Sequence, residues 1–186
     1  VTDLTLTNVK TREFDGPTTF SLATKTASGD FIDATADFAG EAIVASTLID
    51  VSITPLVREV GGVGDLEIDF ATSNALPVDA VIALDYPPEL VFSGSSVVTA
   101  SAPAALAGEA FTVSTDTVAN RLTITRPGTG LVVAAGSSFN LTISDVSNPV
   151  WVIAPVYSLS TLIGGESARI DARDGLVETE FVAGSL

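Results

Sequence analysis

Acidic side chains occur in short clusters, and their spacing makes them the residues of this chain best suited to bind a metal ion. Two clusters comprise Asp30, Asp33 and Asp37, and Asp171 and Asp174. Carboxylate oxygens are the ligands that calcium prefers. Aspartates also form turns, in which the side chain accepts a hydrogen bond from nearby backbone. The sequence therefore leaves two interpretations, a pair of calcium sites that stiffen a joint between units or a set of turn-forming residues.

A third acidic set alternates with apolar residues. Asp65, Glu67 and Asp69 would lie about 7 Å apart on one face of a strand. Like charges at that distance repel unless water or a cation lies between them. Calcium loops use an Asp-x-Asp-x-Asp-Gly pattern, which this sequence lacks. A solvated acidic face is therefore favoured over a calcium site here.

Catalytic chemistry has few candidate side chains. The chain contains no His and no Cys, which removes the commonest general base and every thiol nucleophile. A glycosidase needs two carboxylates in a cleft with aromatic side chains that hold the sugar, and aromatic residues make up only 6% of this chain. We therefore expect no enzyme activity. The net charge of −15 also argues against binding to nucleic acid.

Two further residues are candidates for recognition. Trp151 follows an Asn-Pro-Val sequence and is either a core residue or an exposed platform, which would stack on a sugar or anchor a neighbouring unit. Asn140 begins an Asn-Leu-Thr glycosylation sequon. Because Leu141 and Ile143 would point into a core, Asn140 would point outward and accept a glycan.

The elements that position these residues have a period of two. Apolar and polar residues alternate over 3–9, 65–70, 121–125 and 139–144, and turn residues separate these segments. Strands at this spacing are typical of an all-β, immunoglobulin-like antiparallel β-sandwich. Only Ala100–Ala110 favours a short helical turn. No apolar run approaches the roughly 18 residues that a membrane-spanning helix needs.

The two ends of the chain resemble each other. Residues 4–9, 20–22, 32–34 and 44–48 match residues 141–146, 157–159, 170–172 and 182–186, at an offset of 137 followed by one inserted residue. This repeat predicts that 1–49 is the C-terminal part of one sandwich unit, or a strand-exchanging half, and that 51–186 is a complete unit. A duplicated pair of sheets within one domain is the alternative.

An incomplete unit would expose apolar strand faces and open strand edges. Leu4, Leu6 and Val9 are the apolar residues of its first segment, and we expect them at an interface. Either a neighbouring copy completes the sandwich with its own strands, or the rest of the unit lies upstream in a longer chain. Both alternatives predict partners that are other copies of the chain or adjacent repeats.

The second unit resembles a known group of proteins. Residues 72–77 (Thr-Ser-Asn-Ala-Leu-Pro), 80–87 and 139–149 are similar to the "TSNPLP", "I.I.FP" and "TISGVTNP" segments of immunoglobulin-like repeats in very large microbial surface and filament proteins, which continue with "F.I.T…G…ID". Ala75, Tyr86 and Asp145 depart from that pattern. The resemblance implies an extracellular or cell-surface location and a non-catalytic structural role. An adhesin or carbohydrate-binding module, with glycans as partners, is the alternative.

Overall fold

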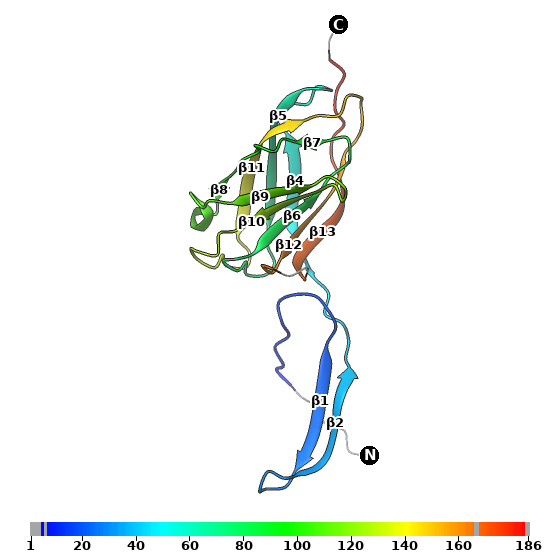
Figure 1. Ribbon diagram of the computed structural model, residues 1–186, viewed down its shortest axis with the longest axis vertical. Helices are drawn as coiled ribbons and strands as arrows, with labels where there is room; N and C mark the ends of the chain where they lie inside the picture. Colours follow the sequence, from blue (N-terminus) through cyan, green and yellow to red (C-terminus); the bar gives the residue numbers. More distant parts are fainter. Residues whose placement is uncertain (1–4, 6, 166–167, 185–186) are drawn as a thin grey trace.

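Strands make up nearly all of the regular structure, as the period-two pattern requires. The computed structural model describes residues 5, 7–165 and 168–184. A β-sandwich begins at Ser46, and a separate two-stranded hairpin precedes it (Figure 1). The hairpin projects from one end of the sandwich, here called the lower end, and the C-terminal residues leave from the opposite, upper end. No helix in the described part of the chain is long and apolar enough to span a membrane.

Two sheets form the sandwich. In the six-stranded sheet the spatial order is β3 (Ser46–Thr47), β13 (Arg169–Val177), β12 (Val156–Leu162), β6 (Val81–Asp85), β10 (Arg121–Thr125) and β9 (Thr112–Asp116). The other sheet has the order β4 (Ile49–Pro55), β5 (Val63–Ala71), β11 (Ser138–Ser147) and β7 (Val91–Phe92), with β8 (Val98–Ala102) also paired to β11. All neighbouring pairs are antiparallel except β3 and β13, which run parallel.

Alternation along the strands builds the core. In β5, Leu66, Ile68 and Phe70 are buried, whereas the acidic residues between them reach the surface. Phe70 stacks on Phe139 of the neighbouring β11 with ring centroids 4.6 Å apart. The expected all-β, immunoglobulin-like antiparallel sandwich is therefore confirmed. Its assembly from strands of a neighbouring copy stays a prediction.

Local predictions vary in their outcome. Strands over 65–70, 121–125 and 139–144 are present as β5, β10 and β11. Of the expected strand over 3–9, residues 3, 4 and 6 lie outside the described residues, and the described residues Thr5 and Thr7–Val9 form no strand. Within Ala100–Ala110 the short helical turn is the 3-10 helix η1 (Ala104–Leu106), and it follows directly after β8.

The hairpin consists of β1 (Thr19–Lys25) and β2 (Phe31–Ala39), and every residue of both strands is exposed. Its large apolar side chains, each between 44% and 67% exposed, are Phe20, Leu22, Phe31, Ile32 and Phe38. The turn between the strands uses Gly29 at φ 94°, a left-handed conformation that favours glycine. An isolated two-stranded hairpin is marginally stable in water, yet this one carries enough apolar surface to belong to a core.

The hairpin reproduces the β12–β13 pair of the sandwich. β1 and β12 both have seven residues, and β2 and β13 both have nine. Register irregularities fall after the second and sixth residues of β1 and recur at the same two places in β12. The left-handed residue of β2, Asp37 at φ 58°, corresponds to Gly175 at φ 68° in β13.

The correspondence continues outside the strands. The Ile43 amide donates to the Gly16 carbonyl at 3.0 Å, as the Phe181 amide donates to the Ile153 carbonyl at 3.0 Å. Asn8 and Asp145 both have left-handed backbone, with φ values of 58° and 57°. The sequence similarity between the two ends of the chain is therefore accompanied by the same backbone geometry, although only the second segment packs into a sandwich.

Candidate functional site

The hairpin aspartates are exposed and hydrogen-bond within the hairpin. The Asp30 carboxylate accepts from the Ser28 hydroxyl at 2.7 Å, and the Asp33 carboxylate from the Thr24 hydroxyl at 3.5 Å. Asp37 occupies the left-handed position of β2. Among the described residues, no three His, Cys, Asp or Glu side chains lie close enough to hold a metal ion. The calcium sites stay a prediction. Of the two contacts, that of Asp30 lies in the turn between the strands, whereas Asp33 bonds to its cross-strand partner Thr24.

Asp171 is buried and closes a loop of the sandwich. One carboxylate oxygen accepts hydrogen bonds at 3.1 Å from the backbone amides of Ser73 and Asn74, and the other accepts one at 2.9 Å from the Asn74 side chain. Its side chain is fully buried. Because three donors surround the carboxylate, Asp171 fixes the loop that follows β5 against β13.

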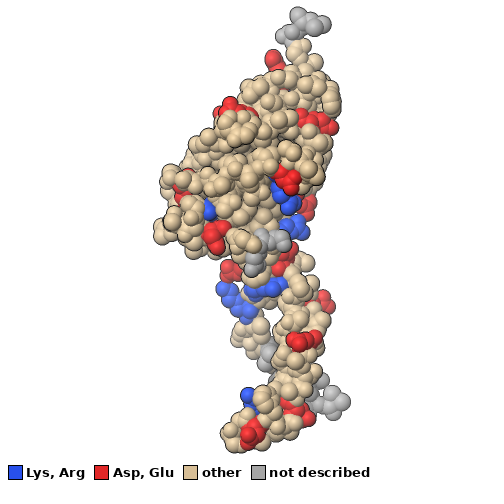
Figure 2. Space-filling view, in the orientation of Figure 1, with Lys and Arg blue, Asp and Glu red and all other residues tan. Residues whose placement is uncertain are grey.

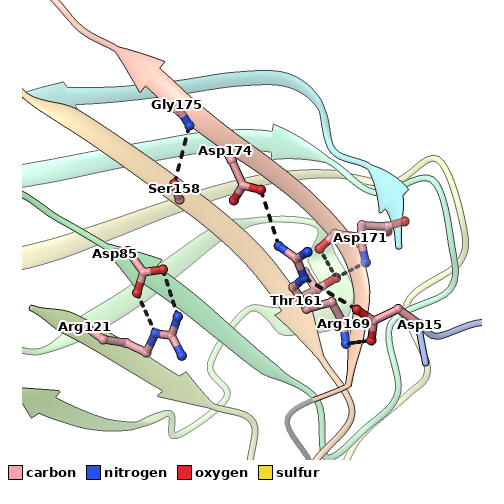
Figure 3. A network of polar contacts seen from close by, with 9 residues as sticks. All are labelled: Asp15, Asp85, Arg121, Ser158, Thr161, Arg169, Asp171, Asp174 and Gly175. Atoms are coloured by element: carbon pink, nitrogen blue, oxygen red, sulfur yellow. Dashed lines mark hydrogen bonds and ion pairs between the residues drawn. The ribbon is translucent and has the colours of Figure 1, made fainter. Parts of the chain in front are cut away.

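Arg169 lies beside Asp171 and joins the sandwich to the segment that precedes the hairpin (Figure 3). Its backbone amide donates to the Asp15 carboxylate at 2.6 Å, and the Asp15 amide donates to the Arg169 carbonyl at 2.8 Å. The guanidinium lies 3.6 Å from Asp15 and 3.4 Å from Asp174. Since these ion pairs are partly solvated, the two backbone hydrogen bonds are the stronger part of the contact.

This contact is the centre of a junction between the sandwich and residues 10–17. Phe14 is half-buried against the sandwich core, and the Arg12 guanidinium lies over its ring, 4.6 Å from the centroid. Beside Phe14 is an open cavity of about 520 Å³, which Ala75, Pro77, Ile163 and Ile170 line from the sandwich side. The junction is thus an aromatic side chain seated on the lower end of a sandwich.

Charge is distributed unevenly around the junction. Figure 2 shows basic side chains gathered where the hairpin segment meets the sandwich, whereas acidic side chains are spread over the visible face. Lys10 and Arg12 line the junction cavity, Arg169 pairs with Asp15, and Arg173 lies beside β3 and β4. Four of the eight basic residues of the chain therefore lie at the junction or near the lower end of the sandwich.

Trp151 lies in an exposed apolar run between β11 and β12, in a loop that bonds through Ile153 to Phe181 of the C-terminal segment, which leaves from the upper end. It is 54% exposed, between Val150 at 73% and Val152 at 49%. The preceding Asn148 holds this loop, because its amide donates to the Val57 and Glu59 carbonyls at 2.8 and 2.9 Å. Core packing of Trp151, one of the two interpretations from sequence, is wrong.

The other expected interface residues are only partly placed. Val9 is 63% exposed, and Leu4 and Leu6 lie outside the described residues. Their role at an interface stays a prediction.

Asn140 bridges the acidic face of β5. Its amide nitrogen donates to Glu67 at 2.6 Å and to Asp69 at 2.8 Å, and its oxygen accepts from the Ser101 hydroxyl. The two carboxylates are thus joined by an amide group. Among the described residues, the acidic side chains of β5 do not form a group of three that could hold a metal ion. A glycan on this nitrogen would remove one of its two N–H donors and with it one of the hydrogen bonds to Glu67 and Asp69. Glycosylation of Asn140 stays a prediction.

A buried ion pair was not foreseen. The Arg126 side chain is fully buried and donates twice to Glu109, at 3.0 and 2.6 Å. Its remaining donors reach the carbonyls of Leu76, Pro77 and Leu131. Because all of its partners are protein groups, Arg126 holds three loops of the sandwich together.

Residues of the motifs behind the family resemblance fix loops of the sandwich, and one motif contacts the Ile170-Asp171 pair that ends the pattern. Ser73 and Asn74 of the first motif hold Asp171 of the final Ile-Asp pair. Asn148 of the third motif holds the loop at residues 57–59. Asp145, where the family pattern has Gly, has φ 57°, a region that Gly occupies without strain. The motif residues are therefore loop-fixing residues.

Comparisons with known proteins identify no family. No family model matches the chain, and no curated protein matches it. Among solved structures it is similar to BcpA, the major pilin subunit of Bacillus cereus, at 10% identity and a TM-score of 0.40, over 89% of this chain and 47% of the pilin. A variant of that pilin matches over the same shares of the two chains, at 11% identity and a TM-score of 0.36.

A family GH18 chitinase from Chromobacterium violaceum matches at 12% identity and a TM-score of 0.30, over 62% of this chain and 17% of the chitinase. The chain spans about half the length of the pilin structures. At these TM-scores the likeness assigns no function.

Proposed function

We propose that this chain is a structural repeat module of an extracellular filament, appendage or cell-surface rod, in which sandwiches are packed end to end. One observation carries the proposal: the hairpin β1–β2 has the geometry of β12–β13 but lacks the sandwich that covers β12–β13. A strand pair with this construction belongs to a unit of the same fold. The chain therefore presents the end of one unit followed by the body of the next.

Burial of the corresponding side chains supports this role. Tyr157, Leu159 and Ile170 are 1%, 0% and 2% exposed. Their counterparts in the hairpin, Phe20, Leu22 and Ile32, are 51%, 51% and 61% exposed. Full burial of one such side chain contributes about 1.5–3 kcal/mol. Covering these hairpin side chains with a partner would therefore stabilise the hairpin by several kilocalories per mole.

Hydrogen bonding indicates which partner fits. The amide of Asp33 donates to the Thr24 hydroxyl at 3.1 Å, as the amide of Asp171 donates to the Thr161 hydroxyl at 3.1 Å. In the sandwich, the Asp171 carboxylate also receives the loop at Ser73 and Asn74, and β12 pairs along its length with β6. We therefore expect the partner of the hairpin to offer a β6-like strand edge and a loop that holds Asp33.

Extending the chain tests this proposal. In a variant where residues 50–140 precede residues 4–186, the added body should fold onto β1–β2, and hydrogen exchange of the hairpin amides should slow to the level of β12–β13. A control with β1–β2 replaced by the sequence of β12–β13 restores the natural pairing. Rapid exchange of the hairpin in the variant, alongside a folded control, would contradict the proposal.

The route of assembly is a separate question. Strand exchange between copies predicts that deleting residues 1–9 abolishes polymerisation, since Leu4, Leu6 and Val9 would be lost. Tandem packing within a longer chain predicts no such loss. Electron microscopy of native material distinguishes either route from isolated monomers, because both give regular fibres with an axial repeat of one unit.

A carbohydrate-binding module is a second candidate, favoured by the exposed indole of Trp151. Aromatic platforms of this kind stack on sugar rings. Binding to a glycan array that the Trp151→Ala variant loses, in a chain that forms no fibres, would favour this alternative. The exposed residues 150–152 are otherwise apolar, which suits a protein contact better than a sugar.

A further inference from the structure

The exposed apolar run Val150–Val152 has a counterpart elsewhere in the same chain. The Gly16–Ile43 contact corresponds to the Ile153–Phe181 contact, so Phe14 corresponds to Trp151. Both aromatic residues precede their contact by two positions. What covers Phe14 therefore indicates what covers Trp151.

The lower end of a sandwich covers Phe14. Phe14 packs against the sandwich core, and the amide of the next residue, Asp15, donates to the Arg169 carbonyl at 2.8 Å. The residue after Trp151, Val152, occupies the position of Asp15 and is 49% exposed. At the upper end, both the aromatic side chain and the following residue thus lack the cover that their counterparts have.

We infer that Trp151 is the docking residue for the lower end of a following sandwich of the same fold, which rests on the proposed end-to-end function. On the following sandwich, the Trp151 indole takes the place that the Phe14 ring has here. The Val152 amide donates to the carbonyl at the Arg169 position of that following sandwich. The upper and lower ends of one sandwich are then complementary, and such a head-to-tail contact continues indefinitely.

The occupant is a sandwich that follows in the same array. In a free second copy of this chain, the lower end is already covered by that copy's own Phe14 and Asp15. A sandwich joined after residue 186 is not preceded by a second copy of residues 1–48. Residues 145–186 of the sandwich before it stand in the position of that segment. Covalent connection also raises the effective concentration, so a small contact is sufficient.

The size of the indole agrees with this occupant. The Phe14 junction retains an open cavity of about 520 Å³, which Ala75 and Ile163 help to line. An indole is larger than a phenyl ring and fills more of such a space. The loop that presents Trp151 is held in place by Asn148, so the side chain is offered from a fixed backbone.

Tryptophan fluorescence tests the inference, because the chain has one Trp. The test protein is a tandem of residues 1–186 followed by residues 49–186, with Trp151→Phe in the second copy. Compared with the single chain, its emission should move to shorter wavelength, and acrylamide quenching should fall roughly twofold as the indole becomes buried. The Phe14→Trp, Trp151→Phe variant of the single chain gives the signal of an indole in the known junction.

Two outcomes overturn the inference. One is unchanged emission and quenching in the tandem while both sandwiches are folded, as their thermal transitions report. The other is unchanged quenching together with glycan binding through Trp151, which would assign the run to carbohydrate recognition. The Trp151→Glu tandem should lose any gain in melting temperature that the tandem with Trp151 has over the single chain, because the docking contact would no longer stabilise the sandwiches. Hydrogen exchange of β1–β2 tests the proposed function separately, since the hairpin lies at the other end.

Discussion

The two hairpins of this chain have one backbone geometry and two environments. β12–β13 has its register irregularities inside a sandwich, and β1–β2 has the same irregularities in solvent. Local sequence is therefore sufficient to specify the register, the bulges and the left-handed residue of such a pair. Burial and side-chain hydrogen bonding are supplied by the body of the sandwich. The difference between the hairpins isolates what a partner adds to a strand pair.

The largest difference is expected from core truncation. Leu159→Ala should destabilise the sandwich by about 2–5 kcal/mol because it leaves a cavity in the core. Leu22→Ala, at the corresponding position, should change stability by less than about 0.5 kcal/mol. Urea denaturation of both variants measures the contrast. Similar losses would mean that β1–β2 is already packed in this chain.

The next largest difference should arise at the paired aspartates. Asp171→Ala leaves the Ser73 and Asn74 amides without their acceptor, which should cost about 2–3 kcal/mol. Asp33→Ala removes an exposed carboxylate and should be close to neutral. The same denaturation experiment applies, with Asp171→Asn as a control that keeps the side-chain volume. A neutral Asp171→Ala would contradict the role of Asp171 in fixing the loop that follows β5 against β13.

Exchanging residues between the hairpins should have a smaller effect. The Tyr157 hydroxyl is buried and has no hydrogen-bond partner among the described residues, and the hairpin has Phe20 at this position. Tyr157→Phe should therefore be neutral or stabilising by up to about 1 kcal/mol. A clear loss of stability would reveal a partner of the hydroxyl, such as a buried water.

Because the Tyr157 hydroxyl is buried, the stability of the sandwich should depend on pH in the alkaline range. Burial raises the pKa of Tyr157 well above its ordinary value, and the nearby charge of Glu178 adds to the effect. The unfolded chain loses the tyrosine proton first, so this contribution to stability is complete below about pH 10 and falls as the pH rises further. Thermal melts between pH 8 and 11, compared with Tyr157→Phe, should show a shallower decline in the variant. Parallel curves would contradict the assignment.

The smallest effect is expected from divalent cations. Asp171 is saturated by the loop donors, and the hairpin aspartates bond within the hairpin. Addition of EDTA should therefore leave the melting temperature of the sandwich unchanged. A decrease that calcium reverses would restore the calcium sites that the acidic clusters suggested, and would place them at the junction or at the hairpin.

Alternation made part of this fold predictable. β5, β10 and β11 each have one buried face and one solvated face, so their period is visible in sequence. β3 and β7 are two residues long, too short to show a period. The 3–9 segment alternates as β11 does, but Thr7–Val9 form no strand, because within the described part of the chain no strand pairs with them.

Sites were less predictable than strands because their contacts are long-range. The Arg126–Glu109 pair joins the residue that follows β10 to the loop before β9, and no spacing rule connects the two residues. Trp151 could not be placed from its neighbours, since Val-Trp-Val suits a core as well as a surface. The similarity between the two ends of the chain was visible in sequence, but the roles that it indicates for Asp33 and Phe14 required the contacts of Asp171 and of the lower end of the sandwich.

The parallel pairing of β3 with β13 affects how the chain would carry load. The chain enters the sandwich through β3 and leaves it beyond β13, at opposite ends of the molecule. Tension between the two ends would pull these neighbouring strands along their length in opposite directions. Hydrogen bonds such as that from the Leu48 amide to the Ala172 carbonyl would then be loaded in shear, all at once, and would not be opened one after another.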